Sequence, residues 1–79
     1  MSRAGATIRR RAVILAGHRT SVSIEDAFWA ALKEIADRDG VSVNSIVASI
    51  DVARSGNLSS AVRVYVLDRL RWRVNAGTA

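Results

Sequence analysis

The chain has 79 residues, no cysteine, no proline and a formal net charge of +5. A chain of this size forms one domain and buries only about 60% of the surface that it exposes when unfolded. Because neither a disulfide nor a Cys/His zinc cluster can reinforce so small a core, we expect the chain to enlarge its core by forming a homodimer.

Basic charge is concentrated at the two ends of the chain. Residues 1–20 contain five arginines and no acidic residue, whereas residues 21–58 contain three basic and six acidic residues. A basic end without a basic amphipathic helix favours nucleic acid over a membrane as the polyanionic partner. The alternative is that these arginines only keep the chain soluble. No apolar run approaches the roughly 18 residues of a membrane span, so we expect a cytoplasmic protein with no membrane partner.

The N-terminal part predicts an arm followed by one short strand. Residues 1–11 are expected to form a flexible basic arm, and residues 12–15 are an apolar run too short to assign by its period. Residues 18–24 then alternate strictly between two faces, which predicts a strand. Val22 and Ile24 share the inward face. The outward face carries Arg19, Ser21 and Ser23.

Two helices joined by a tight turn follow the strand. Ser23 is the expected N-cap of the first helix, and apolar residues recur in it at helical spacing, namely Phe28, Leu32, Ile35 and Ala36. Gly40 is expected to end this helix, because glycine adopts the left-handed conformation easily. Ser42 is the expected N-cap of the second helix, whose apolar stripe is Val43, Ile46, Val47, Ile50 and Ala53.

Residues 57–74 predict a third helix, and residues 75–79 a tail. Residues 62–66 alternate as a strand would, so helix and strand compete there. We favour a helix because the segment is longer than a usual strand, begins with a capping residue at Asn57 or Ser59, and is apolar on nearly all sides. The fold class is therefore mainly α with one short β-strand.

A single strand leaves its main-chain N–H and C=O groups unpaired and is a template for another strand. We expect residues 18–24 to pair with the same strand of a second chain. The product would be an intertwined homodimer with a two-stranded antiparallel β-ribbon, which has the width to enter the major groove of DNA.

Residues 40–45, Gly-Val-Ser-Val-Asn-Ser, resemble the turn between the two helices of the ribbon-helix-helix family of DNA-binding proteins, the Arc and methionine repressor type. Residues 18–29 and 57–63 are similar to a bacterial subfamily with an added C-terminal helix. The resemblance covers about residues 12–70. It implies a ribbon-helix-helix domain over residues 12–56 and a C-terminal helix over residues 57–74 that extends the core or the dimer.

The resemblance also implies roles for individual residues. Base contacts would come from Arg19, Ser21 and Ser23. Ser42 and Asn44 would hold DNA phosphates at the start of the second helix, where free N–H groups favour an anion. We expect further attraction to phosphates from Arg9, Arg10 and Arg11. In the simpler alternative, the two strand serines are ordinary surface residues, and Ser42 and Asn44 only cap a helix.

We therefore predict a sequence-specific transcriptional regulator, a repressor, that binds double-stranded DNA as a homodimer or higher oligomer. One alternative is an antitoxin-like interaction module in which residues 58–74 bind a protein partner and DNA binding is autoregulatory. Another is non-specific binding of nucleic acid. His18 is the only histidine. It has no ligand at metal spacing and no second general base nearby, so we expect no enzyme activity, metal or cofactor.

Overall fold

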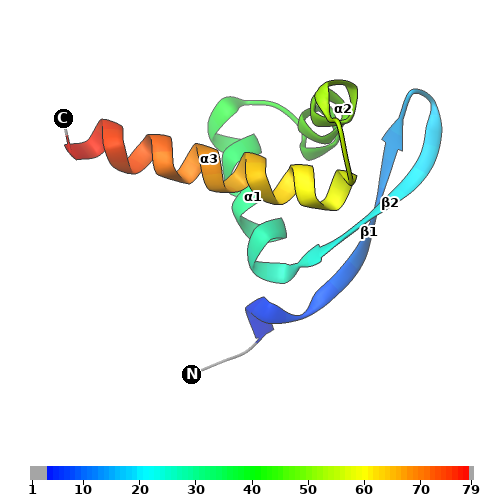
Figure 1. Ribbon diagram of the computed structural model, residues 1–79, viewed down its shortest axis with the longest axis horizontal. Coiled ribbons are helices and arrows are strands. Elements are labelled where there is room, and N and C mark those ends of the chain that lie inside the picture. The colour runs from blue at the N-terminus through cyan, green and yellow to red at the C-terminus, as the bar shows by residue number, and fades with distance from the viewer. Residues whose placement is uncertain (1–3, 79) are drawn as a thin grey trace.

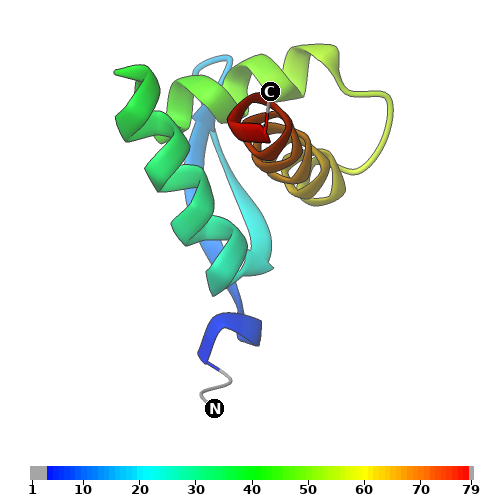
Figure 2. The same cartoon turned by 90° about the vertical axis from the view of Figure 1, so that its left-hand side faces the viewer.

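The computed structural model describes residues 4–78, which form an antiparallel hairpin followed by three α-helices (Figure 1). In chain order the elements are a short 3-10 helix η1 (Ala4–Ala6), β1 (Ile8–Leu15), β2 (His18–Glu25), α1 (Asp26–Asp39), α2 (Val43–Ala53) and α3 (Leu58–Thr78). The helices lie on one side of the hairpin and leave its other side open, as Figures 1 and 2 show from two directions. The two-stranded antiparallel sheet, the two helices that follow it and the added C-terminal helix confirm the expected ribbon-helix-helix fold, with two strands in the chain where one was expected.

Both strands of the ribbon come from one chain, which differs from the expected pairing between two chains. The register runs from Ile8 opposite Glu25 to Leu15 opposite His18. The two residues of the turn, Ala16 and Gly17, have φ values of 52° and 80°. Positive φ at both positions matches the right-handed twist of a two-residue hairpin. The expected flexible arm over residues 1–11 is wrong for residues 8–11, which belong to β1.

Helices of the same chain contact both outer edges of the hairpin. On the β2 edge, the Ser23 N–H donates to Ser59 Oγ of α3 at 3.2 Å, and Arg63 of α3 pairs with the Glu25 carboxylate at 2.8 Å. On the β1 edge, the side chain of Asn44 in α2 bonds to Ile14. The edge of β2 is therefore closed at Ser23, where pairing with a second β2 strand would require α3 to move.

The turn between α1 and α2 has the predicted signals. Gly40 ends α1 with φ 69°, and the next N–H, that of Val41, donates to the Ala36 carbonyl at 3.0 Å. The Ser42 hydroxyl accepts the Ser45 N–H at 3.0 Å and so caps α2. The predicted cap of α1 is wrong, because β2 continues past Ser23 and places Glu25 at the N-cap.

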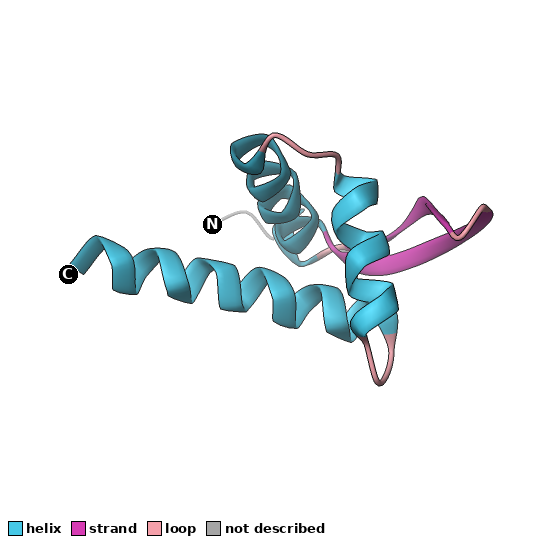
Figure 3. Cartoon of the chain, turned by 90° about the horizontal axis from the view of Figure 1, so that it is seen from above, coloured by secondary structure: helices cyan, strands magenta, loops and turns pink. Residues whose placement is uncertain are grey.

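Helix α3 begins where the sequence predicts and ends later. Asn57 Oδ1 accepts the Ser60 N–H at 3.1 Å, one of the two expected caps. The helix continues to Thr78, so residues 75–78 are helical rather than a tail, and Ala79 lies outside the described residues. Figure 3 shows α3 running away from the hairpin.

The core lies between the inner face of the hairpin and the helices. All five long elements contribute to it, with the buried side chains of Val13, Leu15, Val22, Ile24, Leu32, Ile35, Ala36, Ile46, Val47, Val62 and Val66. The predicted inward strand residues, Val22 and Ile24, are fully buried. Burial of one hairpin face fixes which side chains the other face presents, because successive residues of a strand alternate.

Candidate nucleic-acid interface

The open side of the hairpin carries four cross-strand pairs of side chains, and the pair farthest from the turn is Ile8 opposite Glu25, whose carboxylate is paired with Arg63. The three pairs nearer the turn contain no acidic residue. Residues directly opposite in an antiparallel pair project to the same side of the sheet. The register places Arg10 opposite Ser23, Ala12 opposite Ser21 and Ile14 opposite Arg19. We call these six residues the outer face. All are exposed except Ser23, which is half-buried beside α3.

The outer face is positively charged. Arg10 and Arg19 are its two ionised side chains, and none of the six residues is acidic. Arg10 Nη2 donates to Ser21 Oγ at 3.1 Å, which links the two strands across the face. Figure 3 shows the hairpin extending beyond the helices, so the face is accessible to a large partner. An exposed basic ribbon of two strands has the dimensions and charge of a major-groove reader.

The three consecutive arginines of β1 lie on two different sides of the hairpin. Arg9 and Arg11 project to the side opposite Arg10, and both pair with the Asp26 carboxylate at the start of α1, each at 3.0 Å. The Arg11 guanidinium also lies 5.3 Å from the centre of the Trp29 ring. The sequence predicted one basic cluster for phosphates. Strand alternation instead leaves Arg10 on the outer face and holds its two neighbours in ion pairs.

Two further arginines join α3 to the rest of the fold. Arg63 donates to the Glu25 carboxylate, and this hydrogen bond holds the pKa of Glu25 below its usual range. Arg69 binds both carboxylate oxygens of Asp39, at 2.7 and 2.9 Å, and lowers the pKa of that group in the same way. Arg69 also donates to the Tyr65 hydroxyl at 2.8 Å. These pairs hold the end of β2 and the end of α1 to α3.

The start of α2 lies beside β1, where Asn44 contacts the hairpin directly. Asn44 Oδ1 accepts the Ile14 N–H at 2.7 Å, and its Nδ2 donates to the Ile14 carbonyl at 2.8 Å. The side chain thus bonds to both main-chain groups of one residue, as a neighbouring strand would. Ser42 is engaged as the cap of α2. Both predicted phosphate contacts therefore have structural roles, at a helix N-terminus that adjoins the hairpin.

Arg10, Ala12 and Ile14 are outer-face residues whose placement the sequence analysis missed. The missing signal was the turn: once Ala16 and Gly17 are taken as a two-residue hairpin loop, alternation backward from Leu15 assigns every residue of β1 to a face. Ala-Gly is a weaker turn signal than Asn-Gly. Ile14 is 52% exposed, although it lies between the buried Val13 and Leu15.

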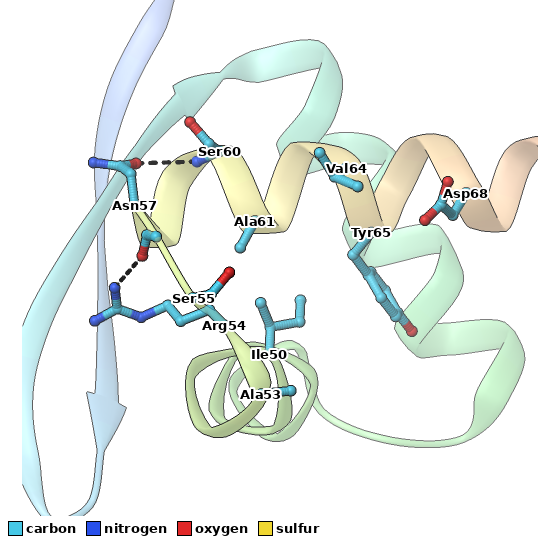
Figure 4. A pocket seen from close by; sticks show the side chains of 11 residues that line it. Ile50, Ala53, Arg54, Ser55, Asn57, Ser60, Ala61, Val64, Tyr65 and Asp68 are labelled. Atoms are coloured by element: carbon cyan, nitrogen blue, oxygen red, sulfur yellow. Dashed lines mark hydrogen bonds between the residues drawn. The ribbon is translucent and has the colours of Figure 1, made fainter.

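A second open surface lies between α2 and α3. Figure 4 shows Ile50 and Tyr65 projecting into a groove whose walls include Ala53, Ala61 and Val64. A second hollow, which shares Ile50, Ala53 and Tyr65 with this groove, is lined also by Val41 and Ile46. Farther along α3, Leu67, Leu70 and Trp72 are exposed, Trp72 by 67%. One chain thus leaves a large part of its apolar helix surface uncovered.

Other kinds of site receive no support from the part of the chain that the structure describes. Among residues 4–78, no group of three or more His, Cys, Asp and Glu side chains could hold a metal ion. Within the same residues, no helix has both the length and the apolar character needed to cross a membrane.

A family model for the ribbon-helix-helix domain matches residues 8–70, so the chain belongs to the ribbon-helix-helix family, a family of DNA-binding regulators. An uncharacterized protein from Bordetella pertussis Tohama I has a similar solved structure, with a TM-score of 0.82 and 27% sequence identity. The similarity covers 96% of this chain and 66% of that one, so this chain spans just under two thirds of its neighbour's length. No curated protein matches the sequence.

Proposed function

We propose that the protein is a sequence-specific DNA-binding transcriptional regulator, which acts as a repressor by occupying a promoter. The observation that carries this proposal is the outer face: two arginines, two serines and no carboxylate in the three pairs nearest the turn of an exposed two-stranded ribbon, with Glu25 of the fourth pair held in an ion pair with Arg63. A ribbon of this width fits the major groove, where each base pair presents a distinct pattern of donors and acceptors. Membership of the family supports the same conclusion.

In this proposal Arg19 and Ser21 contact base edges. Arg19 is exposed close to the hairpin turn, and a guanidinium that forms two bonds to guanine O6 and N7 is the commonest specific contact in the major groove. The Ser21 hydroxyl is exposed and can rotate to donate or accept. Ser23 is half-buried, and its main chain is bonded to Ser59, so its contribution to base contacts is smaller.

Phosphates would bind at the start of α2. The N–H groups in the first turn of a helix lack partners within the helix, and the helix dipole favours an anion there. Asn44 keeps one amide hydrogen beyond the one that it donates to Ile14. Arg9 and Arg11 share one carboxylate, so together they retain one positive charge and attract phosphates more weakly than two free arginines.

The regulator would act in the cytoplasm as a homodimer or higher oligomer. A second copy of the chain would cover the apolar groove between α2 and α3 and the exposed residues of α3. Exposed apolar patches on this scale mark interfaces. The same observation favours a second candidate, an antitoxin-like module whose residues 58–74 bind another protein. Sedimentation equilibrium of the purified chain separates the two: a dimer supports the first, and a monomer at micromolar concentration supports the second.

The proposal is tested by selecting bound duplexes from a random DNA pool. The affinity for the most enriched duplex is then compared with the affinity for scrambled DNA by fluorescence anisotropy at several salt concentrations. We expect a pseudo-palindromic or repeated site with a large affinity ratio. Arg19→Ala should weaken binding to this site by about 5- to 150-fold while changing binding to scrambled DNA much less.

Arg38→Ala is the matched control, because it removes the same charge from the exposed end of α1, away from the hairpin (Figure 1). It should leave the ratio of the two affinities unchanged. No enrichment in the selection, with binding that disappears as salt rises, would refute sequence-specific regulation and leave non-specific binding.

A further inference from the structure

Strand β1 contributes to the outer face together with β2, the strand that carries the predicted base contacts. We propose that β1 also contacts bases, with Arg10 bound to a guanine and Ile14 packed against a thymine methyl group. This inference rests on the proposed DNA-binding function and adds to it a second arginine and an apolar contact from the same chain.

The first argument is the position of Arg10. Register and alternation place it on the same side as Arg19 and Ser21, whereas Arg9 and Arg11 project to the other side. Its bond to Ser21 Oγ uses one of the five guanidinium N–H donors and holds the group along the face. A neutral hydroxyl competes with a base edge far less than a carboxylate does, because bonds between two ionised groups are the stronger ones.

The second argument is the exposure of Ile14. This side chain is 52% exposed, whereas the residues on either side of it, Val13 and Leu15, are buried. Its main chain is held by Asn44 at 2.7 and 2.8 Å, so the side chain stands at a fixed position on the outer face, opposite Arg19. The C5-methyl group of thymine is the one apolar feature of the major groove, and an aliphatic side chain is its complement.

The spacing of these residues predicts the spacing of the bases. Arg10 and Ile14 are four residues apart on one strand, a distance of about 13 Å. Successive bases of one DNA strand are about 3.4 Å apart along the helix, so a hairpin lying along the groove spans about four steps between the two contacts. Each hairpin would therefore recognise a guanine through Arg10, and a thymine beside the Arg19 contact about four base pairs away.

The experiment compares Arg10→Ala, Arg10→Lys and Arg9→Ala on the selected site, on scrambled DNA and on sites with single base-pair changes. We expect Arg10→Ala to lose about 5- to 150-fold on the selected site and to become indifferent to one base pair that the wild-type protein discriminates. Arg10→Lys keeps the positive charge but loses the planar guanidinium, which can form two bonds to one base. It should therefore retain binding to scrambled DNA and lose the ability to discriminate that base pair. Arg9→Ala, from the opposite side of the same strand, should weaken binding to selected and scrambled DNA alike, because it removes a phosphate attraction, and should keep every base preference.

Ile14 is tested by replacing single thymines in the selected site with deoxyuracil, which removes only the methyl group. One such replacement should weaken binding by the wild-type protein and have no effect on Ile14→Ala. Circular dichroism confirms that each variant folds, which is expected because both side chains are exposed.

Two outcomes would overturn the inference while the proposed function stands. Either Arg10→Ala weakens selected and scrambled DNA equally, which is the behaviour of a phosphate contact, or it changes neither while Arg19→Ala still abolishes the preference. A wild-type protein without any preference would instead refute the proposed function, and the role of β1 with it.

Discussion

Asn44 connects α2 to the hairpin through two hydrogen bonds to a single residue. Its amide accepts the Ile14 N–H at 2.7 Å and donates to the Ile14 carbonyl at 2.8 Å. Asn44→Ala removes both hydrogen bonds, so that the N–H and C=O groups of Ile14 at the β1 edge can bond only to water. We expect this change to destabilise the fold and to loosen the hairpin at this position.

The expected magnitude follows from the number of bonds and the exposure of their partner. Each such bond contributes about 0.5–1.5 kcal/mol net, so two contribute about 1–3 kcal/mol. Because Ile14 is 52% exposed, water replaces part of what is lost, and the lower part of this range applies, about 1–2 kcal/mol. In a domain of this size that loss corresponds to a decrease in Tm of about 4–16 °C.

The assay is urea unfolding followed by circular dichroism, at one protein concentration because self-association adds to apparent stability. Asn44→Asp should also destabilise the fold, since it sets a carboxylate oxygen against the Ile14 carbonyl, although the retained acceptor and the helix dipole at the start of α2 offset part of this loss. Amide hydrogen exchange gives a local readout. The Ile14 N–H should exchange faster in Asn44→Ala, whereas those of Val13 and Leu15, which point toward β2 by alternation, keep their protection.

Ser49→Ala is the control, because Ser49 lies on the same helix and its hydroxyl bonds only within α2, to the Ser45 carbonyl. It should change the free energy of unfolding by less than about 0.5 kcal/mol. If Asn44→Ala behaves like Ser49→Ala and Ile14 exchange is unchanged, the amide does not close the strand edge, and the reasoning is wrong.

Two further predictions concern the turn and the ion pairs. Gly17→Ala should lower the free energy of unfolding by about 1 kcal/mol, because φ is +80° there and a side chain is strained in that region even in open space. Gly56→Ala, at an open position without positive φ, should not lower it in the same urea assay, and equal losses would contradict the strain argument. Arg63 and Arg69 lower the pKa values of Glu25 and Asp39 in the folded state. The two ion pairs therefore stabilise the fold fully at pH values above the ordinary pKa values of 4.5 and 3.8, and this stabilisation is lost as the pH falls through the lower pKa values of the folded state. Unfolding measured from pH 7 to pH 2 should show this loss, and a Glu25→Gln, Asp39→Asn double variant should show a flatter profile, whereas an unchanged profile would exclude these pairs as its source.

Local signals predicted the helices and the turn between them. Gly40 and Ser42 act within one or two residues of their own position, through the left-handed conformation of one and the hydroxyl of the other. The inward face of β2 was predicted for the same reason, since alternation needs only the strand itself. Val22 and Ile24 are fully buried as that pattern requires.

The first strand of the hairpin could not be predicted in this way. Three consecutive arginines favour a solvated arm until Asp26 and Trp29 are brought beside two of them. Asp26 lies 15 residues from Arg11 in sequence, and no local pattern connects the two. The predicted roles of Arg19, Ser21 and Ser23 remain predictions, as do those of Ser42 and Asn44.

The amino-acid sequence by itself determined where α1 ends, where α2 and α3 begin and which residues of β2 face inward, because capping, backbone conformation and side-chain alternation act over a few residues. The tertiary structure decided which strand pairs with β2, which of three adjacent arginines reaches the outer face, and that Asn44 bonds to Ile14. These depend on contacts between residues 11 to 38 positions apart, whose free energy exists only when the helices have packed on the hairpin and brought the partners together.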